Sequence, residues 1–256
     1  MATPSESLQE PAAAGRQRRL RTLAIVPAYN EQDSIATVLE QIRAAEPALH
    51  VVVVNDASRD RTAAIAARSG ATVLNLPFNV GIGGAMQTGY QYALEHGFEL
   101  AIQVDGDGQH DPREIRRVLE PILEGRADLV VGTRFVKGGG YRGTRVRRVG
   151  IRIFAAVVSL LVGQRVSDTT SGFRAVNRKA LGLFAAQYPH DYPEVESIVL
   201  LSRHGLRMLE VPVQMRVRES GASSITALRA AYYMIKVLLA LFIGLFRRYP
   251  SSQEES

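Results

Sequence analysis

Two closely spaced aspartates are the residues whose chemistry stands out first. Asp105 and Asp107 lie in the segment VDGDGQHDP (104–112), directly after an apolar run. If the chain stays extended there, residues two apart point the same way and both carboxylates converge. Two carboxylates held close need a cation, and oxygen ligands suit Mg²⁺ or Mn²⁺, which usually also bind substrate phosphates. The segment therefore predicts a metal and phosphate site, with an acidic turn capped by Asp111 before a helix as the alternative.

The composition narrows the remaining chemistry. The chain has no cysteine, which excludes disulfides, thiolate nucleophiles and Cys-ligated zinc. Residues 129–167 contain no acid and carry +8, which leaves −2 for the rest of a chain with net charge +6. Such a local basic segment indicates one anionic partner. Only Phe135 and Tyr141 are interleaved as aromatic residues in the basic loop, too few for a nucleic-acid stacking platform.

The acidic cluster must be positioned by the elements of residues 23–133, which alternate short apolar runs with helical patterns. The expected strands are 23–26, 51–54, 71–76, 100–104 and 129–131, and the expected helices are 34–45, 60–69, 84–96 and 112–124. This alternation predicts βαβ units and a mostly parallel sheet, and the four valines of 51–54 indicate a strand covered on both faces. Ligands bind at the carboxyl ends of such strands, where residues 29–31, 55–56 and 105–111 form polar clusters.

The pattern changes after residue 134. A basic loop begins at 138–140, a helix is expected at 149–162, and 209–217 is the clearest later strand. We expect residues 1–22 and 249–256 to be disordered tails.

A mostly apolar helix is expected at 225–248. Its stretch 230–246 has 17 residues with Lys236 as its only charge, at the lower limit of spanning length. We expect it to lie on a membrane surface or to pack a homo-oligomer, with a transmembrane span or a buried core helix as alternatives.

Several motifs together resemble those of family 2 glycosyltransferases of the GT-A fold, in the group that includes dolichol- and polyprenyl-phosphate sugar transferases. The motifs are VPAYNE (26–31), VNDASRDRT (54–62), NVGIGGAMQTG (79–89), VDGDGQHDP (104–112), GTR (132–134), SGFR (171–174) and VPVQMRVRESGASS (211–224). The resemblance implies a Rossmann-like α/β catalytic domain over 23–224. Its mixed, mostly parallel sheet is flanked by helices, with a nucleotide-sugar half at 23–133 and an acceptor half at 134–224.

The resemblance also implies roles for individual residues. The nucleotide-sugar site would comprise Pro27, Ala28, Tyr29, Glu31, Asp56, Gly84, Asp105 and Arg218. Asp107 and Gln109 would hold Mg²⁺ or Mn²⁺. The acceptor would meet Arg134, Arg147, Arg148, Ser171 and Arg174. The catalytic group would be Asp105, Asp107, Arg134 and Asp168. Ser224 stands where the family often has a lysine.

The glycine run needs a separate interpretation. It lacks the third glycine of GxGxxG and follows the third expected strand, which argues against a dinucleotide site. We read residues 81–84 as a loop that lets the next helix approach the nucleotide.

The function implied is an inverting, metal-dependent transfer of a sugar from a nucleoside-diphosphate sugar to polyprenyl phosphate, by a protein peripheral to the cytoplasmic face of a membrane or, less readily, by a single-span protein. A phosphate acceptor is already largely a dianion at pH 7 and needs guidance by cations more than deprotonation. A saccharide or protein hydroxyl is the alternative acceptor and would need a general base, for which we favour Asp168 over Glu194 and Glu196. A non-catalytic nucleotide-sugar or lipid-binding subunit is the alternative from another class.

Overall fold

A computed structural model describes residues 20–133 and 145–216 together with Lys236, and gives only the backbone of 145–152. Residues 1–19 and 249–256 of the expected tails, Arg134, Arg218 and the expected helix at 225–248, apart from Lys236, lie outside the described residues. Residues 20–22 are described, and Thr22 begins a strand, so the expected tail at 1–22 extended too far. Within the described part of the chain, no helix combines the length and the apolar character needed to cross a membrane.

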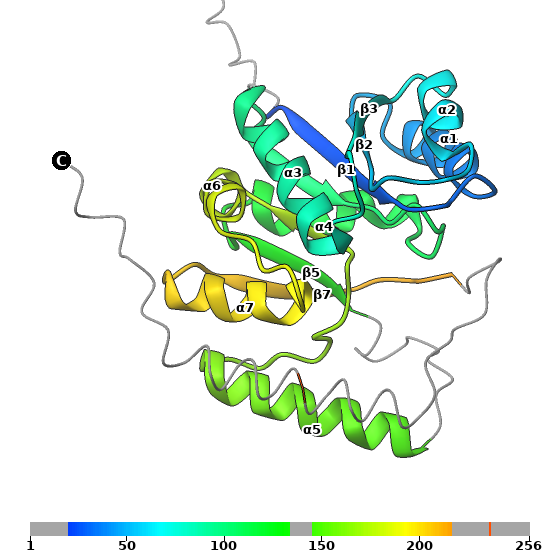
Figure 1. The fold of residues 1–256 in the computed structure, drawn as a ribbon. Coiled ribbons are helices and arrows are strands. Elements are labelled where there is room, and N and C mark those ends of the chain that lie inside the picture. Colours follow the sequence, from blue (N-terminus) through cyan, green and yellow to red (C-terminus); the bar gives the residue numbers. More distant parts are fainter. Residues whose placement is uncertain (1–19, 134–144, 217–235, 237–256) are drawn as a thin grey trace, which may run out of the picture.

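A single seven-stranded sheet forms the centre of the molecule (Figure 1). In chain order the strands are β1 (Thr22–Ala28), β2 (His50–Asn55), β3 (Thr72–Asn75), β4 (Leu100–Gln103), β5 (Leu129–Thr133), β6 (Arg174–Val176) and β7 (Met208–Pro212). Their order across the sheet is β3-β2-β1-β4-β6-β5-β7. Only β6 is antiparallel to its neighbours β4 and β5. The predicted mixed, mostly parallel sheet is confirmed.

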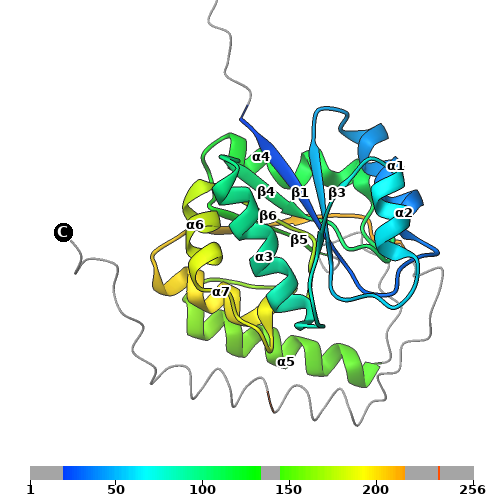
Figure 2. The same cartoon turned by 45° about the horizontal axis from the view of Figure 1, so that its top comes forward.

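Helices cover both faces of this sheet (Figures 1 and 2). They are α1 (Ile35–Ala45), α2 (Thr62–Arg68), α3 (Gly81–Glu95), a short 3₁₀ turn η1 (Pro112–Glu114) that leads into α4 (Ile115–Leu123), α5 (Arg145–Val162), α6 (Arg178–Ala186) and α7 (Pro193–Arg203). Residues of α3, α5, α6 and α7 share one core cluster, and residues of α1, α2 and α4 share the other. In both views α5 runs alongside α7.

The strand β1 shows why the apolar runs lack polar alternation. Successive side chains of a strand point to opposite faces. Leu23 and Ile25 belong to the core beneath α3, whereas Ala24 and Val26 belong to the core beneath α1 and α4. Each of the four is almost fully buried, so neither face can carry a polar residue. The expectation of a sheet covered on both faces is confirmed.

The glycine run is helical, so the expected loop at 81–84 was wrong. The Asp56 carboxylate accepts hydrogen bonds from the N–H groups of Val80 and Gly81, which satisfies free donors at a helix start and lets α3 begin at Gly81. Gly84 is buried, and a Cβ there would lie 2.6 Å from Val80 Cγ2. The absence of a side chain at Gly84 therefore leaves room for Val80 at the start of the helix.

The end of β7 also differs from the sequence-based prediction. The strand pairs with β5 only as far as Pro212, and the expected strand at 209–217 does not continue along that ladder. Met215 instead forms a bridge with His110, and Arg216 N donates to Gln109 O at 2.8 Å. The chain therefore leaves the sheet edge and crosses to the turn that follows β4.

Asp128 ties the starts of β5 and β7 and the end of β6 together. Its carboxylate accepts hydrogen bonds from Arg207 N at 2.8 Å and Asn177 Nδ2 at 2.7 Å. Burial acts to raise its pKa, but these hydrogen bonds and the Arg207 charge outweigh burial, and the pKa is lowered.

Replacing Asp128 by alanine is expected to reduce the free energy of unfolding at pH 7 by about 1–3 kcal/mol, since the hydrogen bonds from Arg207 and Asn177 to a buried carboxylate are lost. A carboxylate with a lowered pKa stabilises the fold above the usual carboxyl range near pH 4, and that contribution is lost as the pH falls through the lowered pKa. Urea unfolding at pH 7 and at several acidic pH values measures this difference. A difference that grows on acidification contradicts the assignment.

Candidate active site

The loops after β1, β2 and β4 meet at one edge of the sheet, as the polar clusters predicted. Pro27 O accepts a hydrogen bond from Gly106 N at 3.4 Å, and Ala28 O accepts one from Asp56 N at 2.9 Å. Pro27 and Ala28 are themselves buried. Their carbonyl oxygens therefore hold the three loops together. These two residues could contact a ligand only through their backbone atoms.

Gly106 allows the loop after β4 to come this close. A Cβ on Gly106 would lie 3.2 Å from Pro27 O and 3.4 Å from Ala28 Cβ, tighter than an ordinary contact. Ser34 Oγ donates to Gly106 O at 2.7 Å and lies 3.1 Å from Glu31 Oε2. The Glu31 carboxylate is thereby placed at the junction of the loops after β1 and β4.

Asp56 lies at the start of α3, and exposed apolar side chains lie on the segments that it is bonded to. Besides the bonds it accepts from the backbone at the helix start, each carboxylate oxygen retains a further lone pair. Tyr29, which follows the residue bonded to Asp56 N, is 44% exposed, and Phe78 is 67% exposed. Ile82, in the first turn of α3, is also exposed. Phe78 and Ile82 were not predicted from the sequence, although Phe78 directly precedes the glycine run that was singled out and Ile82 lies within it.

The chain turns at Gly106 and Asp107, so the extended chain on which the convergence of the two aspartates was conditional is not present. Gln109 N donates to Asp107 Oδ1 at 3.0 Å, and both residues are partly exposed. Asp107 and Gln109 thus lie on one short turn, beside the loops that follow β1 and β2.

This turn fits a divalent cation only as part of a ligand set. Among the residues that the structure describes, no three His, Cys, Asp or Glu side chains gather in a way that could hold a metal. The carboxylate of Asp107 and the amide oxygen of Gln109 are hard oxygen donors, and Mg²⁺ is usually bound by one or two carboxylates plus substrate phosphates and water. The donor chemistry therefore fits such an ion if a diphosphate completes the set.

Asp105 is held from several sides. His110 Nδ1 accepts a hydrogen bond from Asp105 N at 3.0 Å, and His110 Nε2 lies 3.5 Å from Asp105 Oδ2. The His110 ring is buried and stacks on Phe173 at 4.8 Å between centroids. Gln103 Nε2 donates to Asp105 Oδ1 at 2.9 Å. These contacts fix the carboxylate of Asp105 in one orientation.

The SGFR segment (171–174) lies directly against Asp105. A Cβ on Gly172 would lie 2.8 Å from Gln103 Nε2 and 3.1 Å from Asp105 Oδ2. Ser171 is buried, and its Oγ donates to Gly132 O at 2.6 Å. The segment therefore forms a wall of the site, while the hydroxyl of Ser171 is used inside the protein and not for an acceptor.

Arg174 needs the same correction. It is fully buried, and its guanidinium donates to Ser171 O at 2.5 Å, to Ser197 Oγ at 2.8 Å and to Glu194 O at 3.3 Å. These bonds join the SGFR segment to the start of α7. A guanidinium enclosed in this way supports the site from behind, so the expected acceptor contact is not supported by the geometry.

The structure also changes which carboxyl is the better candidate for a general base. Asp168 is fully buried, and its N–H donates to Glu210 Oε1 at 2.9 Å. Glu194 is partly buried at the start of α7. Burial raises its pKa, the Arg174 charge opposes this, and the Asp105 charge raises the pKa further. The candidate base whose pKa is raised by the charge of Asp105 is therefore Glu194, whereas the sequence favoured Asp168.

The basic residues expected to guide an acceptor are only partly placed. Arg147 and Arg148 lie in the first turns of α5, which begins at Arg145, four residues earlier than expected. Their side chains are not described, and Arg134 and Arg218 lie outside the described residues.

Comparisons with known proteins agree with this arrangement. Residues 23–184 match the family model described as "Glycosyl transferase family 2". The chain is 31% identical over 227 residues to polyprenol monophosphomannose synthase from Mycolicibacterium smegmatis, covering 85% of each chain. It is 33% identical over 216 residues to undecaprenyl-phosphate mannosyltransferase from Micrococcus luteus, covering 81% of this chain and 88% of the relative.

A solved structure shares the fold. It is glucosyl-3-phosphoglycerate synthase from Mycobacterium tuberculosis in complex with Mn²⁺, UDP and glucosyl-3-phosphoglycerate, with a TM-score of 0.68 at 22% identity. The match covers 88% of this chain and 80% of that one.

Proposed function

The chain belongs to glycosyl transferase family 2, and on that premise we propose that this nucleotide-sugar glycosyltransferase moves a sugar onto polyprenyl phosphate at a membrane surface. The observation that carries the proposal is that the loops carrying Asp56, Asp105 and Asp107 meet at one edge of the sheet. The names of the two relatives, each aligned over more than four fifths of this chain, supply the acceptor class.

The donor end follows from the loops at the sheet edge. We assign Asp56 to the base or ribose, whose donors can use its remaining lone pairs, and the exposed ring of Tyr29 to an apolar contact with the nucleotide. Asp105, fixed by His110, faces the sugar. Asp107 and Gln109 would hold Mg²⁺ or Mn²⁺ together with the diphosphate. The ion supplies Lewis-acid stabilisation of the leaving diphosphate when bound.

The acceptor end accounts for the charge distribution. A phosphate oxygen attacks the anomeric carbon while the bond from that carbon to the diphosphate oxygen breaks, and the nucleoside diphosphate leaves with the bonding electrons. This single displacement inverts the anomeric centre. The phosphate monoester is largely a dianion at pH 7, so no base must remove a proton. We propose that Arg134, Arg147 and Arg148 guide this anion, with Arg218 on the diphosphate.

We place the protein at the cytoplasmic face of the membrane. The basic charge of 129–167 suits an anionic surface, and the apolar sequence of 225–248 suits the interface or a second copy of the chain.

A hydroxyl acceptor is the second candidate, and the surroundings of Glu194 favour it. Burial and the charge of Asp105 raise the pKa of Glu194, which suits a general base. In that case Glu194, and not Asp168, would take the proton.

The proposal is tested with purified protein, a panel of nucleoside-diphosphate sugars and polyprenyl phosphate. We expect one or a few donors to yield a polyprenyl-phosphate sugar with Mn²⁺ or Mg²⁺, and no product with EDTA. Sugar transfer from no donor in the panel, with metal and acceptor present, contradicts the proposed activity.

Replacing Arg147 and Arg148 together by alanine is expected to raise the KM for polyprenyl phosphate by about tenfold or more, since charge-assisted hydrogen bonds contribute about 1.5–3 kcal/mol each. The affinity for the nucleoside diphosphate should stay unchanged. Steady-state kinetics and calorimetry separate the two effects. Arg126→Ala, which removes an exposed arginine paired with Glu124, is the control. Equal losses for donor and acceptor count against the guiding role.

A further inference from the structure

The segment that leaves β7 lies across the turn that carries Asp107 and Gln109. Met215 forms an antiparallel bridge with His110, and Arg216 N donates to Gln109 O at 2.8 Å. The main chain of Gln109 is therefore held by a segment more than 100 residues away in the sequence. Whatever holds that segment in place also controls the position of the turn.

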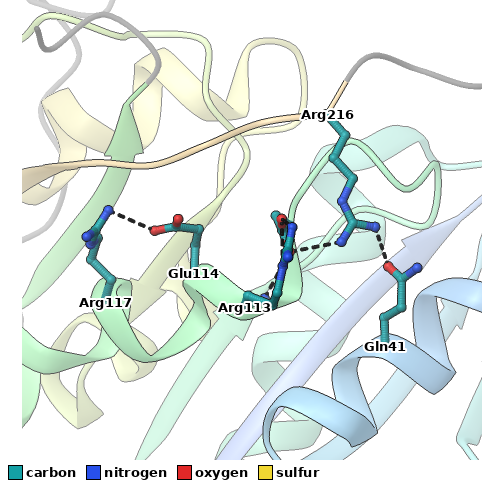
Figure 3. A network of polar contacts seen from close by, with 6 residues as sticks. Gln41, Arg113, Glu114, Arg117 and Arg216 are labelled. Atoms are coloured by element: carbon teal, nitrogen blue, oxygen red, sulfur yellow. Dashed lines mark hydrogen bonds and ion pairs between the residues drawn. The ribbon is translucent and has the colours of Figure 1, made fainter. Parts of the chain in front are cut away.

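The Arg216 side chain makes this attachment (Figure 3). Its Nη2 donates to Asp111 Oδ1 at 3.0 Å, and its Nη1 donates to Gln41 Oε1 at 2.5 Å. Figure 3 shows the side chain reaching from the segment after β7 toward Gln41 on α1. The Arg216 side chain is 32% exposed and Asp111 is buried, so water screens this ion pair less than an exposed one. One arginine thus links the segment, the end of the turn and α1.

Asp111 is a fixed anchor for Arg216 because its own turn already holds it. Asp111 is the N-cap of η1 and accepts a hydrogen bond from Arg113 N at 3.1 Å. Arg113 also pairs with it through its side chain, but Arg113 lies on the same turn and is 76% exposed. Asp111 therefore has a local arginine and a distant one, and only the distant one connects two parts of the chain.

A second attachment lies at the start of the segment. Arg117 on α4 donates to Pro212 O at 3.2 Å and pairs with Glu114 at 3.1 Å (Figure 3). This contact fixes where the segment departs from β7, whereas Arg216 fixes where it meets the turn.

We propose that Arg216 is a positioning residue of the donor site: its bonds to Asp111 and Gln41 dock the segment after β7 on the turn and thereby hold Gln109 in place for the metal and diphosphate. The inference rests on the proposed function for the assignment of Asp107 and Gln109 to the metal. The role assigned to Arg216 is positioning, because the two bonds of its guanidinium go to Asp111 and Gln41 within the protein.

The test compares Arg216→Ala with Arg113→Ala. Both variants remove one arginine from Asp111, but only the first undocks the segment. We expect Arg216→Ala to weaken binding of Mn²⁺ with nucleoside diphosphate by about 10-fold to 100-fold, the range for residues that orient metal ligands. Arg113→Ala should stay within about twofold of the unchanged protein. Electron paramagnetic resonance of Mn²⁺ measures the affinities without any turnover.

Hydrogen exchange of the residue 216 amide reports docking directly, because this N–H donates to Gln109 O. It should exchange faster in Arg216→Ala and at the unchanged rate in Arg113→Ala. Unchanged exchange in Arg216→Ala overturns the proposal, as do equal losses of affinity in the two variants, which would assign the effect to the charge of Asp111. If Arg216→Ala does not fold, Gln41→Ala removes the second acceptor of the same guanidinium, and faster exchange at residue 216 is again required.

The proposed function can fail separately from this inference. Absence of Mn²⁺ and nucleotide binding in the unchanged protein would remove the metal assignment, whereas the exchange comparison would still decide whether Arg216 docks the segment.

Discussion

Asp107→Ala is expected to reduce metal-dependent turnover of the nucleotide sugar by about 10³-fold or more. Asp107 is the partly exposed carboxylate on the turn after β4, and Gln109 N donates to it. A metal that stabilises a leaving diphosphate contributes several kcal/mol to the transition state, and each 1.36 kcal/mol is a factor of ten in rate. Initial rates with and without Mn²⁺ measure the loss.

Asp33→Ala is the matched control, since Asp33 is an exposed carboxylate close to the start of α1. It should retain the rate of the unchanged protein. An Asp107→Ala variant that keeps most of its activity, with that activity still sensitive to EDTA, would show that the ion is held elsewhere.

The second large effect is expected at Asp56. Asp56→Ala should weaken binding of the nucleoside diphosphate by about 10-fold to 100-fold, because a hydrogen bond to a charged group contributes about 1.5–3 kcal/mol. The variant also loses the acceptor for Val80 N and Gly81 N at the start of α3, which should destabilise the fold by about 0.5–2 kcal/mol. Calorimetry and urea unfolding measure the two losses separately.

Asp60→Ala separates the two contributions. Asp60 lies on the same loop and accepts hydrogen bonds from Thr62 N, at the start of α2, and from Gln32 N. Burial acts to raise its pKa, and these hydrogen bonds outweigh burial and lower it. Asp60→Ala should therefore lose stability and keep most of its nucleotide affinity. Equal losses of affinity in both variants would mean that Asp56 acts only through the fold.

The sheet was predictable because burial on both faces leaves a clear pattern in the sequence. The valines of β2 face helices, and so do Leu23 and Ile25 on one face of β1 and Ala24 and Val26 on the other. The two runs are therefore apolar throughout. Element ends were less predictable. The start of α3 depends on Asp56, which lies 25 residues before Gly81. No local pattern at Gly81 contains that information.

The site was predictable where it depends on strand ends, and unpredictable where it depends on β6. Polar residues after parallel strands meet at one edge of a sheet, which brought Asp56 and Asp105 together as expected. The antiparallel strand β6 is inserted between β4 and β5, and its register pairs Arg174 with Gln103. That pairing buries Arg174, whose guanidinium donates to Ser171 O and Glu194 O, and residue spacing does not reveal this arrangement.

The identity of the acceptor is the central claim, and one measurement tests it most directly. We supply equal amounts of polyprenyl phosphate and the matching polyprenol to the purified protein, with its preferred nucleotide sugar and Mn²⁺. The masses of the extracted lipids are then determined by mass spectrometry. We predict a polyprenyl-phosphate sugar as the product, with no glycosylated polyprenol. Sugar on polyprenol, with polyprenyl phosphate left unmodified, would contradict the phosphate acceptor and favour a hydroxyl acceptor.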